Sequence, residues 1–192
     1  GLDLDTANPK ASTRSSVRSA RQKVAEANAS KPAYTARLSF TGIPGFTWRT
    51  AVHYETDMTA GDADGFGIGE IDGTLIETNI SLQRGMFGLR ALYARWDIDD
   101  QINLLNPGAD RQTGWLLEPS LRFDNGLGVF ARYGAYDLTA GTSVSSDARR
   151  QLDVGVNYWL ADGVVIKADL QRQRNDKGAD IDGINLGVGY SF

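Results

Sequence analysis

His53 is the only histidine in the chain, and imidazole is the side chain best suited to proton transfer near neutral pH. A hydrolase built around it would need a serine or an aspartate within reach, as the nucleophile or as the acid that orients the ring. The sequence around His53 gathers no such partners. We therefore predict no catalytic residues and no enzymatic activity, and we interpret His53 as a polar side chain on the face of a strand.

Carboxylates cluster in polar stretches of the chain, where their oxygens are possible ligands for calcium. The groups are Asp62, Asp64 and Glu70; Asp97, Asp99 and Asp100; and Asp176, Asp180 and Asp182. They lack the twelve-residue spacing of an EF-hand, and the chain has no cysteine for a thiolate site. The glycine-rich residues 65–69 lack the dinucleotide-binding pattern and a helix to follow it. We predict neither a metal site nor a cofactor.

Extended segments must position most of the other polar side chains, because the sequence alternates with a period of two. From Ile184 to Phe192, apolar residues fill every second position, and small or polar ones fill the gaps. A strand sends alternate side chains to opposite faces, so one face is apolar and the other polar. Arginine should therefore be far more costly at Val156, on the apolar face, than at Gly155 or Asn157.

The same alternation recurs in nine segments of about ten residues, the length that a tilted membrane-spanning strand needs. They are residues 34–40, 46–54, 76–83, 87–94, 116–123, 129–136, 151–158, 164–171 and 184–192. The pattern predicts an all-β fold, an antiparallel up-and-down transmembrane β-barrel. A soluble lipocalin-like barrel, the alternative, would have its apolar face inside and its polar face outside.

Loop length supports the membrane barrel, because short and long connections alternate strictly along the chain. The short ones are residues 42–45, 84–86, 124–127 and 161–163, and the long ones are residues 56–74, 97–113, 137–149 and 175–182. Outer-membrane barrels have tight periplasmic turns and long extracellular loops. Aromatic residues mark both ends of the strands, as interfacial belts do. Phe40, Phe46, Phe87, Phe123 and Phe192 flank the short turns, and Tyr34, Tyr54, Tyr93, Trp96 and Trp115 flank the long loops.

Composition agrees with this interpretation. A formal net charge of −4 and an isoelectric point near 5.0 argue against a nucleic-acid partner. The mean hydropathy of −0.32 does not exclude a membrane barrel, because the inner side of each barrel strand is polar.

The charged residues of the polar face are the candidate pore-lining residues. They are Arg37, Arg49, His53, Glu77, Arg90, Glu118, Arg122, Arg132, Asp153, Lys167 and Asp169. Opposite charges on facing walls would produce a transverse field across a water-filled constriction and tune its selectivity. The other interpretation is that pairs on neighbouring strands neutralise each other.

Several phrases of the sequence resemble the carboxyl-terminal half of Gram-negative outer-membrane porins, with closest kinship to the phosphate-selective porin O and P superfamily. They are RQKVA at 21–25, AYTARL at 33–38, TGIPG at 41–45, FGLRALYARWD at 87–97, GVNYW at 155–159 and NLGVGYSF at 185–192. The resemblance implies a channel for passive diffusion of small hydrophilic or anionic solutes. Such channels have about 16–18 strands and are usually homotrimers. The outer membrane, with its lipid and lipopolysaccharide, would surround the protein, and Tyr190 and Phe192 would signal to the barrel assembly machinery.

The strand count separates residues 1–33 from residues 34–192. If the chain ends at the periplasmic side, its first strand starts outside, whereas a complete bacterial barrel has an even number of strands and starts in the periplasm. We therefore expect residues 34–192 to be nine strands of a larger barrel. Residues 1–33 would be an extracellular loop, irregular or weakly helical over 18–28, unless they hide a tenth strand.

Overall fold

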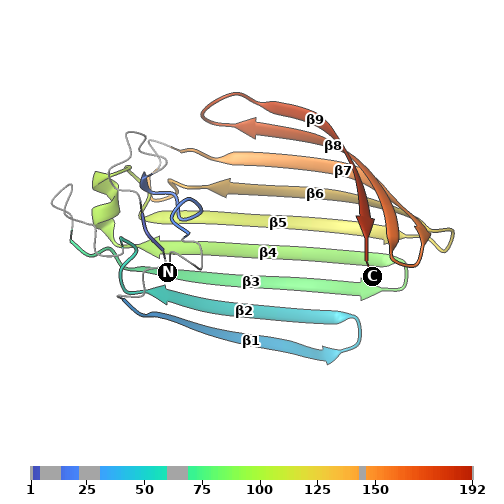
Figure 1. Cartoon of the computed structure of the whole chain (residues 1–192), viewed down its shortest axis with the longest axis horizontal. Helices are drawn as coiled ribbons and strands as arrows, with labels where there is room; N and C mark the ends of the chain where they lie inside the picture. Colours follow the sequence, from blue (N-terminus) through green and yellow to red (C-terminus); the bar gives the residue numbers. More distant parts are fainter. Residues whose placement is uncertain (1, 5–13, 22–30, 60–68, 143–145, 192) are drawn as a thin grey trace.

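Nine antiparallel strands form one sheet whose spatial order follows the chain, β1 to β9 (Figure 1). The computed structural model describes residues 2–4, 14–21, 31–59, 69–142 and 146–191. The strands are β1 (Ala33–Ile43), β2 (Phe46–Glu55), β3 (Gly73–Arg84), β4 (Phe87–Ile98), β5 (Arg111–Arg122), β6 (Leu127–Asp137), β7 (Arg149–Ala161), β8 (Val164–Asn175) and β9 (Ile181–Tyr190). The predicted all-β, up-and-down meander is confirmed.

Tight turns and long loops lie at opposite ends of the sheet, as their alternation along the chain requires. Each of the four tight turns contains a glycine with positive φ, between 57° and 80°, a conformation that other residues rarely adopt. These glycines are Gly45, Gly85, Gly126 and Gly163. In the longer β4–β5 connection, a 3-10 helix, η3 (Asp100–Leu104), is capped by Asp99, whose side chain accepts a hydrogen bond from the Gln101 backbone nitrogen at 2.9 Å. The period-two pattern did not predict this helix.

The sheet is strongly twisted and curled. In Figure 1, β1 to β5 run almost horizontally, whereas β9 crosses the picture steeply. Among the described residues, β1 pairs only with β2 and β9 only with β8, so each has one unpaired edge. No helix among the described residues is long and apolar enough to cross a bilayer.

The two faces of the sheet differ in chemistry as the alternation predicts. On the apolar face, large hydrophobic side chains are exposed: Val154 is 49% exposed, Val156 44% and Leu186 80%. On the polar face, Glu118 and Asp153 are each only 5% exposed. The sheet therefore places its polar side chains in the more enclosed position and leaves its apolar ones uncovered.

Buried apolar residues gather instead at the long-loop end. The cluster comprises Leu2, Leu4, Ala20, Met58, Ile71, Ile98, Ile102, Leu105 and Ala109. Backbone hydrogen bonds connect its segments, from Leu4 N to Met58 O at 2.8 Å and from Met58 N to Ile71 O at 2.7 Å. Trp96 packs against this cluster from the polar face, so its assignment to the outer aromatic belt was wrong.

The described part of the N-terminal segment is held in this cluster. Residues 14–21 form turns, and Leu2 and Arg21 form an isolated antiparallel bridge. The weak helix predicted over 18–28 does not form over the described residues 18–21, and residues 22–28 lie outside the described part of the chain.

Candidate functional site

All eleven candidate pore-lining residues lie on one face of the sheet. The strand register places Arg37 opposite Ala51, which is opposite Glu77, and it places Arg132 opposite Asp153. Because directly paired residues point to the same side, the whole set shares the polar face. Arg149 is a further cation on this face, paired in register with Tyr136 and Asn175. The sequence pattern assigned it to the long loop 137–149, whereas β7 begins at this residue.

The centre of the polar face contains a cross-strand ion network. Arg90 Nε on β4 donates to Glu118 Oε1 on β5 at 2.8 Å, and Arg132 Nε on β6 donates to Glu118 Oε2 at 2.6 Å. Glu118 is buried, whereas the two arginine side chains are 62% and 42% exposed. One carboxylate thus neutralises part of the charge of two guanidinium groups, so the interpretation as neighbouring-strand pairs holds here.

Two further carboxylates of this face, Asp153 and Asp169, are held by amide side chains. Gln151 Nε2 donates to both oxygens of Asp153, at 2.9 and 3.0 Å. Asn185 Nδ2 donates to Asp169 Oδ2 at 2.8 Å. Neutral donors leave the charge of each carboxylate uncompensated, so these groups still contribute to the field over the polar face.

Basic residues without a carboxylate partner lie elsewhere on this face. Among the described residues, Arg37, Arg49 and Lys167 make no ion pair. Arg122 stacks over the Trp159 ring at 4.2 Å from its centroid, a cation–π contact. Gly128 makes room for that indole, because a Cβ there would lie 2.6 Å from the ring.

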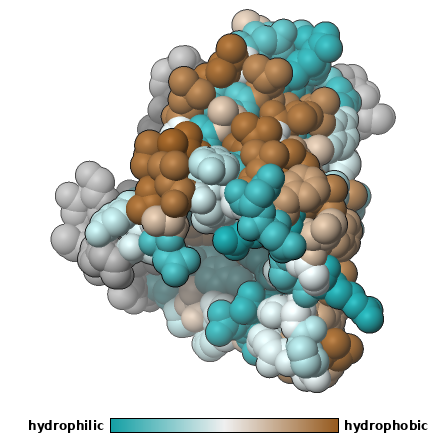
Figure 2. Space-filling view, turned by 90° about the vertical axis from the view of Figure 1, so that its right-hand side faces the viewer, coloured by the Kyte–Doolittle hydropathy of each residue, from teal (hydrophilic) through white to brown (hydrophobic). Residues whose placement is uncertain are grey.

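A hollow of about 530 Å³ opens on the polar face of β3 to β9. The residues that line it include Arg90, Arg122, Asp153, Lys167 and Asp169. Figure 2 views the molecule from the short-turn end and shows a hollow edged by hydrophilic side chains, with hydrophobic side chains spread over the outside. The charged residues therefore face a space that water can fill.

His53 has more partners than the sequence predicted. Thr35 Oγ1, on the neighbouring strand, lies 2.6 Å from His53 Nδ1, and Glu55 Oε1 lies 3.3 Å from His53 Nε2. The Trp96 ring meets the imidazole edge-on at 5.9 Å between centroids. The contact between His53 and Glu55 could have been predicted from the sequence, because residues two apart on a strand point to the same face. The contact with Thr35 could not, because it depends on the register of β1 with β2.

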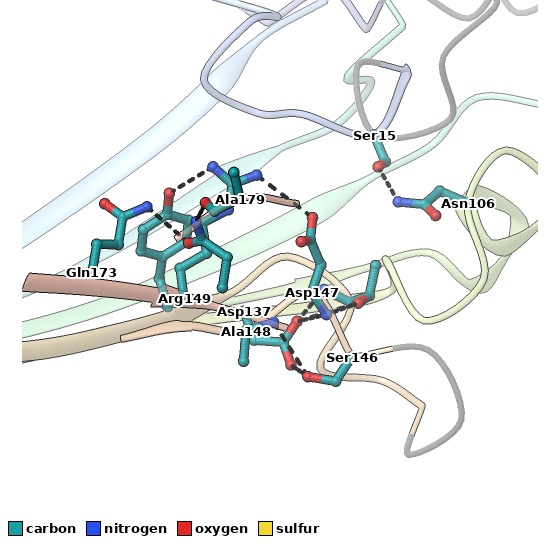
Figure 3. A network of polar contacts seen from close by, with 12 residues as sticks. Ser15, Asn106, Asp137, Ser146, Asp147, Ala148, Arg149, Gln173 and Ala179 are labelled. Atoms are coloured by element: carbon teal, nitrogen blue, oxygen red, sulfur yellow. Dashed lines mark hydrogen bonds and ion pairs between the residues drawn. The ribbon is translucent and has the colours of Figure 1, made fainter. Parts of the chain in front are cut away.

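Polar contacts also bind the long loops together, as Figure 3 shows. Ser146 Oγ lies 3.1 Å from Asp137 Oδ2 and 2.9 Å from Asp176 Oδ2. The hydrogen bond from Ser146, followed by that from Arg150, holds the pKa of the Asp176 carboxyl below its usual range. No group of three or more His, Asp or Glu side chains in the described ranges has a geometry that could hold a metal ion.

The N-terminal segment reaches the polar face at this same end. Gln112 Nε2 on β5 donates to the Ser15 carbonyl oxygen at 2.8 Å, and Asn106 Nδ2 donates to Ser15 Oγ at 2.9 Å. Figure 3 shows Ser15 and Asn106 pointing toward each other. Gln112 shares the polar face with Trp96, so the N-terminal segment lies over the long-loop end of that face.

Some predicted residues fall outside the described part of the chain. Phe192 of the predicted assembly signal and the acidic residues Asp62 and Asp64 are among them. Tyr190 is described and is 70% exposed on the apolar face.

A twisted antiparallel meander with an uncovered apolar face, a charged polar face, tight turns at one end and long loops at the other defines the wall of an outer-membrane β-barrel. A sequence model of the Gram-negative porins matches residues 6–178, and the chain belongs to this family. The protein is therefore located in the bacterial outer membrane, and its family points to a channel rather than an enzyme. A search of curated proteins finds no match.

Proposed function

We propose that the polar face lines a water-filled channel for passive diffusion of small hydrophilic or anionic solutes. The observation that carries this proposal is the opposite character of the two faces. Val156 is exposed on one face, and the adjacent Asn157 borders the charged hollow on the other. This arrangement suits lipid outside and water inside. A lipocalin-like soluble barrel needs the reverse.

Selectivity would depend on which charges remain available to a solute. In the ion network, Glu118 neutralises only one of the two charges of Arg90 and Arg132. Arg49 and Lys167 are exposed on the same face without an ion-pair partner in the described chain. These unpaired cations support a preference for anions. The resemblance to the phosphate-selective porin O and P superfamily makes phosphate the first anion to test.

The protein's partners follow from the membrane location. Unpaired strand edges cannot face lipid, because their backbone groups would lack hydrogen bonds. We propose that further strands of a barrel of about 16–18 strands cover the edges of β1 and β9. We also propose that the barrel forms a homotrimer and that the assembly machinery recognises Tyr190 and Phe192.

We propose that residues 1–33 are an extracellular segment and that its described residues 14–21 narrow the channel entrance. The support is the hydrogen bond from Gln112 on the polar face to Ser15. His53, with Thr35 and Glu55, would belong to the channel wall close to this constriction.

The test is the reversal potential of the purified protein, with all the strands of its barrel, in planar bilayers under a salt gradient. The double variant Arg49→Gln/Lys167→Gln removes two unpaired cations from the polar face and should shift permeability toward cations. Arg95→Gln/Arg111→Gln removes two cations from the apolar side, where both lie near Asp97, and should leave it unchanged. Salt near 0.01 M is best, because the Debye length is then about 30 Å. A protein that does not conduct, or equal shifts in both variants, would contradict the proposal.

A further inference from the structure

On the polar face of β8 and β9, two opposite charges lie beside a strand that has few side chains. Lys167 and Asp169 are two residues apart on β8, so both point to the polar face. Their register partners on β9 are Gly187 and Asn185. A Cβ added at Gly187 would meet no atom within 4 Å. This part of the polar face therefore has open space next to an anionic and a cationic side chain.

Lys167 and Asp169 do not neutralise each other, although they are close on the same strand. The Asp169 carboxylate accepts a hydrogen bond from Asn185 Nδ2 at 2.8 Å. The Lys167 side chain extends toward Gly189, since its Cε lies 3.7 Å from the position that a Cβ would have on that glycine. Neither side chain makes an ion pair within the described chain. Both charges are therefore available to a solute at the same time.

Both side chains line the hollow of about 530 Å³ on the polar face, and small-molecule sites typically have volumes of about 300–1,000 Å³. Asp153 on β7 also lines it and adds a second carboxylate on the side of the long loops. Arg132, the register partner of Asp153, donates to Glu118 instead. On β7 and β8, the hollow is thus negative toward the long loops and positive toward the tight turns.

The spacing of the two charges indicates the length of the solute. Residues two apart on a strand are separated by about 6.6 Å, and an extended dipeptide spans about 7 Å. At neutral pH a dipeptide has an ammonium group at one end and a carboxylate at the other. A single amino acid has the same two charges, but it is about half as long and cannot reach both side chains.

We propose that this part of the hollow binds dipeptides, with the peptide ammonium group on Asp169 and the peptide carboxylate on Lys167. A solute with a single charge is attracted by one of these side chains and repelled by the other, whereas a dipeptide satisfies both. Because Gly187 and Gly189 have no side chains, β9 leaves room for peptide side chains of different sizes. The inference rests on the proposed channel, since the polar face of β8 must meet water for a peptide to enter.

The experiment measures binding to the detergent-purified protein, with all the strands of its barrel, by isothermal titration calorimetry. The probe is alanyl-alanine, compared with its N-acetyl derivative, its C-terminal amide and free alanine. Acetylation removes the ammonium charge, and amidation removes the carboxylate charge. Alanyl-alanine should bind about tenfold more tightly than each of the other three, the usual contribution of one charge-assisted contact.

Each charged side chain should control one end of the peptide. Asp169→Asn should abolish the preference over the N-acetyl derivative and keep the preference over the amide, and Lys167→Gln should do the reverse. Glu77→Gln and Arg37→Gln are the matched controls, because they remove the same charges from the polar face outside the lining of the hollow. Both should bind the dipeptide as the wild-type protein does. If a variant does not fold, the comparison of the four solutes on the wild-type protein still decides the matter.

Equal binding of alanyl-alanine and of either capped derivative by the wild-type protein would overturn the proposal, as would loss of the preference in a control variant. Conductance of the same preparations in planar bilayers separates the two proposals. A protein that conducts but does not distinguish the peptides contradicts the dipeptide site alone. One that distinguishes the peptides but does not conduct contradicts the channel alone.

Discussion

The apolar residues of this protein occupy two opposite environments. In the loop cluster, Met58, Ile71 and Ile102 are completely buried, as in any water-soluble core. In the sheet, Val154 and Val156 are about half exposed, whereas the charged Glu118 and Asp153 are buried. The hydrophobic effect explains the loop cluster, because water is excluded there. The sheet is stable only where lipid replaces water on its apolar face.

A charge placed on the apolar face tests most strongly whether lipid covers that face. Val156→Arg places a guanidinium near mid-strand on the lipid side, where it should destabilise the protein by about 2–4 kcal/mol in a bilayer. Unfolding by urea in lipid vesicles, followed by tryptophan fluorescence, measures the loss.

The structure sharpens the control for this variant. Gly155 was expected to tolerate arginine, but a Cβ there would lie 2.7 Å from Ala168 O, Asp169 Cβ and Phe130 Cε1. That expectation was wrong, because the polar face is locally close-packed. Asn157→Arg is the suitable control, since Asn157 borders the hollow. Equal losses in the Val156 and Asn157 variants would refute the assignment of faces.

The loop cluster should respond to a cavity and not to the lipid. Ile102→Ala removes a fully buried side chain of η3 and should cost about 2–3 kcal/mol, at the low end for such substitutions because a loop can partly collapse. Hydrogen exchange of residues 98–110 should rise, while exchange in β7 and β8 stays unchanged. An equal rise in both regions would show that the cluster and the sheet unfold as one unit, which would contradict their independent stability.

The sheet was predictable because its signals are local. Alternation fixes the faces, and glycines such as Gly126 and Gly163 fix the turns, so nine strands and their order follow from the chain. The loop cluster was not predictable. Its members Leu4, Met58 and Ile102 come from segments far apart in the sequence, and no periodic pattern connects them.

The polar site was predictable as a set of residues but not as a set of contacts. Arg90 and Glu118 were both assigned to the polar face, yet their contact depends on the register of β4 with β5. The contact between His53 and Thr35 likewise depends on the register of β1 with β2. A shift of one residue in register would move each partner to the opposite face.

The buried charge of the polar face gives a smaller expected effect. Glu118→Gln keeps one acceptor oxygen for two arginines and should destabilise the protein by about 1–2 kcal/mol, because Arg90 and Arg132 are partly solvated and lose a charged partner. It should also shift the reversal potential toward anions. Glu77→Gln is the control, because among the described residues the Glu77 carboxylate accepts only from Asn79 Nδ2, at 3.0 Å. A stability loss in the control as large as in Glu118→Gln would show that the ion network stabilises the protein no more than a single hydrogen-bonded carboxylate does.

The smallest effect concerns the long loops, where Asp176 follows β8 outside the membrane-spanning strands. Its lowered pKa, caused first by Ser146 and then by Arg150, means that the folded loops favour the charged carboxylate. The stabilisation is therefore complete at neutral pH and is lost as the pH falls through the folded-state pKa, below the ordinary range for aspartate. Relative to the intrinsic exchange rate at the same pH, the amides of residues 146–150 should lose protection at such acid pH in the wild-type protein. Asp176→Asn should show this lower protection already at neutral pH, whereas Asp162→Asn, in the tight turn at the opposite end, should behave as wild type. A loop that exchanges equally in all three proteins would mean that the loop contacts act independently of this charge, leaving the apolar cluster alone to hold the long-loop end.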